Sequence, residues 1–134
     1  MTAEVSYTSH LRTRCKHIKS GEEFITDAPT DNNGRGEAFS PTDTVATALA
    51  SCMFTVMGIK ANTMDIDLIG ATATVTKTMA SNPRRISKIE IHFHFPSEIT
   101  EKNQKILEHT ANTCPVHYSL HPDIEKEIIF NWNT

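Results

Sequence analysis

The chain has 134 residues, of which 38% are hydrophobic and 22% charged, and its formal net charge is -3 at pH 7. This length suits a single domain, residues 1–134, with one modest core. The mild acidity, with no run of more than two Lys or Arg residues, argues against a nucleic-acid surface. The first ten residues contain no apolar segment typical of a secretory signal, and the three cysteines are an odd number. We therefore expect a cytoplasmic protein with reduced thiols rather than a disulfide framework.

The first third of the chain is predicted to form strands over residues 4–9, 13–19 and 23–26, with a turn at Ser20-Gly21. The segment DAPTDNNGRGE, residues 27–37, follows these strands and is rich in Asp, Asn, Gly and Pro. Such a composition predicts a loop, and loops of this kind often lie beside a functional site.

A well-marked helix is predicted to begin next. Ser40 can be its N-cap, Pro41 fits the first helical position, and Asp43 completes a variant of the capping box. Apolar residues then recur at helical spacing: Val45, Leu49, Cys52, Val56 and Ile59. Small and apolar side chains fill most of the other faces, which predicts burial on more than one side. A subunit interface is one way to cover such a helix. The uncharged run, residues 44–59, falls short of the ~18 residues that would suggest a membrane span.

The rest of the chain predicts two strands, a helix and a last strand. The strands cover residues 65–79 and 86–95, and the second places alternate apolar side chains on one face: Ile89, Ile91, Phe93 and Phe95. A helix over residues 100–113, a short helical turn opened by Pro115 and a strand over residues 124–132 follow. The order β-β-β-α-β-β-α-β predicts an α+β fold.

Two of the cysteines, Cys114 and Cys52, are candidates for a reactive thiol. Cys114 directly precedes Pro115 at a helix start, where free N–H groups and the helix dipole favour a thiolate. Cys52 lies in mid-helix among apolar residues that disfavour its charged form, so it needs a cation from elsewhere. On local physics alone Cys114 is the better thiolate, although either cysteine could be a plain core residue. Cys15, on a predicted strand, is read as structural or incidental.

A zinc site is a rival interpretation of the second cysteine segment. CPVHYSLH places Cys114, His117 and His121 in a C-x2-H-x3-H pattern. No second compact pair of ligands stands nearby in the sequence, and His92 and His94 share the polar face of a strand. We therefore expect neither a metal nor another cofactor.

Both cysteine segments resemble the signatures of one family. FSPTDTVATALASCM, residues 39–53, resembles the central helix of the OsmC/Ohr family, named for osmotically inducible protein C and organic hydroperoxide resistance proteins. NTCPVHYSL resembles that family's second signature, and Cys114 follows Cys52 by 62 residues, a separation similar to the family's. The predicted order of strands and helices is also similar, so the resemblance covers nearly the whole chain.

The resemblance implies a thiol-dependent peroxidase of the oxidative stress response that reduces organic hydroperoxides to alcohols. Cys52 would attack the peroxide and become a sulfenic acid, and Cys114 would resolve it to a Cys52–Cys114 disulfide. A dithiol, such as a lipoyl group on a partner protein, would then reduce the disulfide. The family also forms an intertwined homodimer with its central helices at the interface.

The resemblance further implies an arginine that reaches Cys52 from the N-terminal strands. Arg12 best matches that residue, with Arg14 next and Arg35 as a third candidate. On this interpretation the missing cation for Cys52 is supplied by another part of the chain. Without the resemblance, Arg12 would be read as a solvated strand residue.

The acid that holds this arginine departs from the family pattern. The family's glutamate directly follows the helix-opening proline, a place that Thr42 fills here. Asp43 is about half a turn out of phase with Cys52, whereas Glu37 could reach the site from the loop. This departure leaves an alternative open, a non-catalytic module on the same fold that binds a small ligand or senses redox state.

Overall fold

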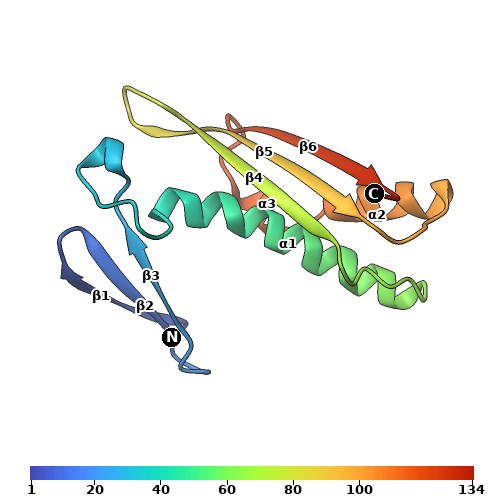
Figure 1. Cartoon of the computed structure of the whole chain (residues 1–134), viewed down its shortest axis with the longest axis horizontal. Coiled ribbons are helices and arrows are strands. Elements are labelled where there is room, and N and C mark those ends of the chain that lie inside the picture. Colours follow the sequence, from blue (N-terminus) through green and yellow to red (C-terminus); the bar gives the residue numbers. More distant parts are fainter. The chain divides into compact units, whose positions relative to one another are not determined.

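The computed structural model describes the whole chain, Met1–Thr134, as two compact units, Met1–Val45 and Ala46–Thr134. Three strands, a long helix, two strands, two short helices and a last strand follow one another (Figure 1). This order confirms the predicted α+β class and the OsmC-like arrangement of elements. Each unit is described by itself below.

The first unit is built on a small antiparallel sheet. Its strands β1 (Ala3–Ser9), β2 (Arg12–His17) and β3 (Glu23–Asp27) lie in sequence order. Their register pairs Arg12 with Asp27 at one end of the sheet and places Cys15 between Val5 and Phe24. The predicted loop after β3 contains one 3-10 turn, η1 (Thr30–Asn32).

The predicted capping box at the start of helix α1 (Pro41–Thr63) is confirmed. The backbone N–H of Asp43 donates to Ser40 Oγ over 3.0 Å, and the N–H of Ser40 donates to Asp43 Oδ2 over 2.9 Å. The two bonds satisfy donors that a helix start otherwise leaves free. They fix where α1 begins, and therefore the direction in which each later side chain of the helix points.

The second unit packs α1 against a mixed sheet. Strand β5 (Arg85–Phe95) is central, antiparallel to β4 (Thr72–Ala80) and parallel to β6 (Glu125–Trp132). Figure 1 shows α1 running along this sheet. The predicted apolar face of β5 is confirmed, because its four alternate side chains are at most 1% exposed: Ile89, Ile91, Phe93 and Phe95. They share one core with Leu49, Met53 and Met57 of α1.

Helices α2 (Glu101–Ala111) and α3 (Pro115–Ser119) form the crossover that makes β6 parallel to β5. The side chain of Thr100 caps α2 by accepting from the N–H of Asn103. Trp132 Nε1 of β6 donates to Glu108 Oε1 of α2 over 2.8 Å. The crossover carries Cys114 to the start of α3 inside this unit.

Within the single chain α1 is covered on one face only. The buried line is Ala46, Leu49, Ala50, Met53, Met57 and Ala61. Val45 and Ile59, which belong to the periodic line seen in the sequence, are 40% and 63% exposed. By length and composition alone α1 could cross a membrane, a property it shares with many core helices of soluble proteins. These two apolar side chains of the helix are left exposed by their own chain.

The strand predicted over residues 65–79 begins only at Thr72, so its first part was wrong. Asp65 and Gly70 have φ angles of 54° and 90°, in the left-handed region that a strand cannot contain. Asp67 Oδ1 also accepts from the N–H of Ile69 over 2.8 Å. This short-range side-chain bond competes with strand pairing and keeps the segment a loop.

Candidate active site

Two thiols meet in the second unit. Cys114 is fully buried, and its Sγ caps α3 by accepting from the N–H of His117 over 3.3 Å. Cys52 is half-buried on α1, packs against the same core, and lies near enough to Cys114 to add to the rise in the pKa of its thiol. Both cysteines are free thiols in this structure. The structure thus brings together the two residues that the sequence singled out.

Burial decides the ionisation of Cys114. It raises the pKa of the Cys114 thiol, and the neighbouring Cys52 adds to the rise. Hydrogen bonds from the N–H groups of His117 and Val116 act in the opposite direction but are outweighed. The expectation that the start of α3 favours a Cys114 thiolate is therefore wrong, because the short helix cannot offset removal of the thiol from water.

Arg12 lies in the first unit within a cluster of carboxylates. Its Nε donates to Asp27 Oδ1 over 2.7 Å, and its Nη2 donates to Asp27 Oδ2 over 2.8 Å. Nη2 also reaches Glu37 Oε1 at 3.4 Å. Asp27 is 1% exposed, whereas the Glu37 side chain is 62% exposed. The structure therefore joins Arg12 and Glu37 through a buried aspartate.

The ion pair changes the pKa values of both Asp27 and Arg12. Hydrogen bonds from Arg12 lower the pKa of Asp27, burial opposes this, and the charges of Arg12 and Arg35 and the N–H of Glu37 add to the lowering. The same hydrogen bond to Asp27 raises the pKa of Arg12. At neutral pH both groups are charged, and each satisfies the other.

The sequence did not single out Asp27, which it placed in the loop of residues 27–37. The available signal was strand register. Arg12 opens β2, Asp27 closes β3, and the turn between these antiparallel strands sets the two opposite each other. The remaining candidates have other partners. Arg14 Nε faces Glu23 at 3.8 Å in an exposed pair, and Asp43 caps α1.

The rival zinc interpretation is not supported by the geometry. Nowhere in residues 1–134 do three or more His, Cys, Asp or Glu side chains gather in a way that could hold a metal ion. Burial and nearby Lys126 lower the pKa of His117. His121 lies instead against Asp123, with Nδ1 and Oδ2 3.8 Å apart.

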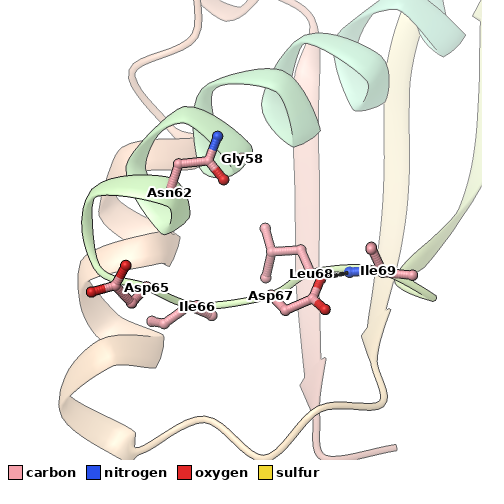
Figure 2. Close-up of a pocket in the computed structure, with 7 residues that line it drawn as sticks. All are labelled: Gly58, Asn62, Asp65, Ile66, Asp67, Leu68 and Ile69. Atoms are coloured by element: carbon pink, nitrogen blue, oxygen red, sulfur yellow. Dashed lines mark hydrogen bonds between the residues drawn. The ribbon is translucent and has the colours of Figure 1, made fainter.

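Two surface hollows differ in their chemistry. One, of about 550 Å³ in the first unit, places Glu37 beside apolar side chains of Phe24, Ile25 and Phe39. The other, of about 580 Å³, lies at the end of α1 and is lined by Asn62, two carboxylates and apolar residues of the following loop (Figure 2). Neither cysteine of the thiol pair lines the second hollow. Of these two hollows, only the first is lined by a candidate site residue, Glu37.

Comparison with known proteins identifies the family. The sequence model of OsmC-like proteins matches residues 34–128. The chain belongs to the OsmC-like family. A candidate osmotic stress induced and detoxification response protein from Psychrobacter arcticus 273-4 is 54% identical, with a TM-score of 0.95 over 98% of this chain and 96% of that chain. The resemblance of the two cysteine segments to OsmC/Ohr proteins is thus confirmed at family level.

More distant OsmC-like structures share the fold. The organic hydroperoxide resistance protein OsmC of Legionella pneumophila is 16% identical, with a TM-score of 0.76 over 98% of this chain and 97% of that one. An organic hydroperoxide resistance protein of Elizabethkingia anophelis, bound to thiocyanate from the crystallisation, is 18% identical, with a TM-score of 0.75 over 99% and 97% of the two chains. No curated protein matches the chain.

We predict that Arg12→Ala destabilises the protein more than Arg14→Ala does at pH 7. Arg12→Ala leaves a buried carboxylate without its partner, whereas Arg14 belongs to an exposed pair that contributes little. Because the pKa of Asp27 is lowered, the pair stabilises the fold above its ordinary pKa of 3.8, and this contribution is lost as the pH falls further. Urea unfolding at pH 7 and pH 3 measures both effects. Equal destabilisation by the two variants at pH 7 would contradict the assignment.

We also predict that iodoacetamide modifies Cys52 before Cys114 at pH 7.5. Cys114 is fully buried and its pKa is raised, so it presents little thiolate to the reagent. Quantitative peptide mass spectrometry of the native protein follows each cysteine separately, and denatured protein gives the reference rates. Faster labelling of Cys114 than of Cys52 would contradict the assignment of Cys52 as the more reactive thiol.

Proposed function

We propose that this OsmC-like protein is a thiol-dependent peroxidase that reduces organic hydroperoxides to alcohols. The observation that carries the proposal is that the half-buried Cys52 and the fully buried Cys114 share one core, where Cys52 helps to raise the pKa of the Cys114 thiol. Two fold relatives named as organic hydroperoxide resistance proteins support it. In this pair Cys52 is the partly exposed cysteine that can react with a substrate. Cys114 is the buried cysteine that can react with oxidised Cys52.

In the first step the Cys52 thiolate attacks the outer oxygen of the peroxide. The O–O bond breaks, the departing alkoxide takes a proton and leaves as an alcohol, and Cys52 becomes a sulfenic acid. The Cys114 thiol then attacks the sulfenic sulfur. Water leaves, and a Cys52–Cys114 disulfide forms. A dithiol restores both thiols by exchange and is itself oxidised.

The burial and the raised pKa of Cys114 suit its role as the second thiol. Burial raises the pKa of Cys114, so this residue stays protonated and does not compete for the peroxide. The sulfenic acid is more electrophilic than a thiol, and the position of Cys114 at the same core as Cys52 gives it a high effective concentration at the second step. Cys52, which is only half-buried, would react first with the peroxide.

The apolar surroundings of Cys52 support this substrate class. Cys52 packs against the hydrophobic core of its unit, and such surroundings favour a lipophilic group over water. An organic hydroperoxide offers such a group, and hydrogen peroxide does not. We therefore propose hydrogen peroxide as a poorer substrate.

A homodimer forms part of the proposal. One face of α1 is left partly uncovered by its own chain, with Ile59 63% exposed. In the first unit Val5, Tyr7 and Phe24 are at least 50% exposed. Apolar surface of this extent in two elements is typical of a protein that meets a second subunit.

We predict that Cys52→Ser lowers the rate of cumene hydroperoxide reduction by roughly a hundredfold or more, because it removes the nucleophile. Stopped-flow measurement with dihydrolipoamide as the reductant gives the rate. Cys114→Ser should still consume one equivalent of peroxide but should fail in sustained turnover. Cys15→Ser is the matched control and should leave the rate unchanged. A Cys52→Ser rate equal to the wild-type rate would sink the proposal and favour the ligand-binding or sensing module.

A further inference from the structure

We propose that the reducing dithiol attacks the sulfur of Cys52 in the Cys52–Cys114 disulfide, and that Cys114 leaves with its sulfur held by the backbone N–H of His117. The inference rests on the proposed function, because it concerns the reduction of the disulfide that the peroxidase forms. It deepens that function by stating which of the two sulfurs meets the reductant. All three residues belong to the unit Ala46–Thr134.

The two sulfurs differ in their access to a reductant. Cys114 is 0% exposed and is a member of the hydrophobic core, whereas Cys52 is half-buried and packs against that core. Leu107 and Ala111 of α2 are also 0% exposed and belong to the same core. An attack on Cys114 would have to open this core and bring apolar side chains into water. Since exchange depends on access to the attacked sulfur, the partly exposed Cys52 is the favoured target.

Cys114 also has a partner for the charge that it carries when it leaves. Its Sγ accepts from the N–H of His117 over 3.3 Å. Such a bond strengthens when the acceptor becomes an anion. The N–H groups of His117 and Val116 both act to lower the pKa of the Cys114 thiol, against the larger effect of burial. Because a leaving thiol of lower pKa departs faster, these bonds offset part of the barrier that burial imposes.

The imidazole of His117 does not supply this stabilisation by charge. Burial and the nearby Lys126 lower its pKa from the ordinary value of 6.5, so the ring is neutral at pH 7.5. The backbone N–H keeps its dipole at every pH. The inference therefore assigns the role to the main chain of His117 and not to its side chain.

The reduction balances as two successive thiol–disulfide exchanges. A thiolate of the dithiol attacks Cys52 Sγ, the S–S bond breaks, and a mixed disulfide joins Cys52 to the reductant. Cys114 leaves as a thiolate and then takes a proton. The second thiol of the reductant loses its proton, displaces the Cys52 thiolate and closes the reductant into a cyclic disulfide. Two electrons pass to the protein, and both cysteines end as thiols.

The position of the mixed disulfide tests the inference. Diamide, which needs no peroxidase activity, first forms the Cys52–Cys114 disulfide in the wild-type protein. Excess β-mercaptoethanol, a monothiol that cannot close into a ring, is then added, and acidic denaturant with N-ethylmaleimide stops the reaction. Peptide mass spectrometry at the earliest times should find the monothiol on Cys52 and the maleimide on Cys114, in about tenfold excess over the reverse pattern. A majority of early adducts on Cys114 overturns the inference.

A proline substitution tests the N–H of His117. His117→Pro removes this donor, and Asn103→Pro is the matched control, because it removes the N–H that Thr100 accepts at the same position of α2, also over 3.3 Å. Proline is tolerated in the first turn of a helix. We expect His117→Pro to slow reduction by dithiothreitol about tenfold, and Asn103→Pro to stay within about twofold of the wild type. His117→Ala keeps the N–H and should be reduced faster than His117→Pro. Equal rates for His117→Pro and the wild type overturn the inference.

A change of leaving group separates this role from a general effect on α3. In a Cys114→Ser background, Cys52 is loaded with thionitrobenzoate, so that dithiothreitol displaces this group instead of Cys114. His117→Pro should then change the release of thionitrobenzoate by less than about twofold. If His117→Pro slows this release as much as it slows reduction of the disulfide, its effect is structural and the inference is overturned.

The outcomes keep the inference distinct from the proposed function. If diamide joins Cys52 to Cys114 and cumene hydroperoxide does not, the proposed peroxidase fails, whereas the adduct position still decides the inference. If both oxidants form the disulfide and the monothiol attaches to Cys114, only the inference fails. If neither forms it, both fail. Should His117→Pro not fold, the position of the mixed disulfide in the wild type decides the inference alone.

Discussion

The hydrophobic core that α1 and β5 share is the constraint on which the positions of Cys52 and Cys114 depend. Cys52 has its place because the capping box fixes the start of α1. Cys114 has its place because the crossover from β5 to β6 passes through α2 and opens α3 at Pro115. Two segments far apart in the sequence are thus brought to one point by the core of β5 and α1. Burial at that point raises the pKa of the Cys114 thiol.

The chemistry is divided between two compact units. The unit Ala46–Thr134 contains both thiols, and the unit Met1–Val45 contains Arg12 with its acids. Each group is internally satisfied, since the thiols interact with each other and the guanidinium is paired with Asp27. Helix α1 carries one basic residue, Lys60 in its last turn, so the helix itself brings no cation next to Cys52.

Much of the fold could be predicted from local patterns. Ser40 and Asp43 mark a helix start, and the alternation along β5 marks a buried face, because both signals depend on neighbouring residues alone. The strand predicted from residue 65 begins only at Thr72. The left-handed backbone at Asp65 and the hydrogen bond that the Asp67 side chain accepts keep the segment before it a loop, despite its apparent alternation. Site energetics were harder to predict. The raised pKa of Cys114 and the pairing of Asp27 with Arg12 both depend on burial and register, which the sequence carries only through the whole fold.

The most direct test is the mass of the intact protein after one equivalent of cumene hydroperoxide in the absence of reductant. The account predicts a loss of two hydrogens per chain, a disulfide that peptide mapping assigns to Cys52 and Cys114, and a free Cys15 thiol. An unchanged mass, or a disulfide that includes Cys15, would contradict it.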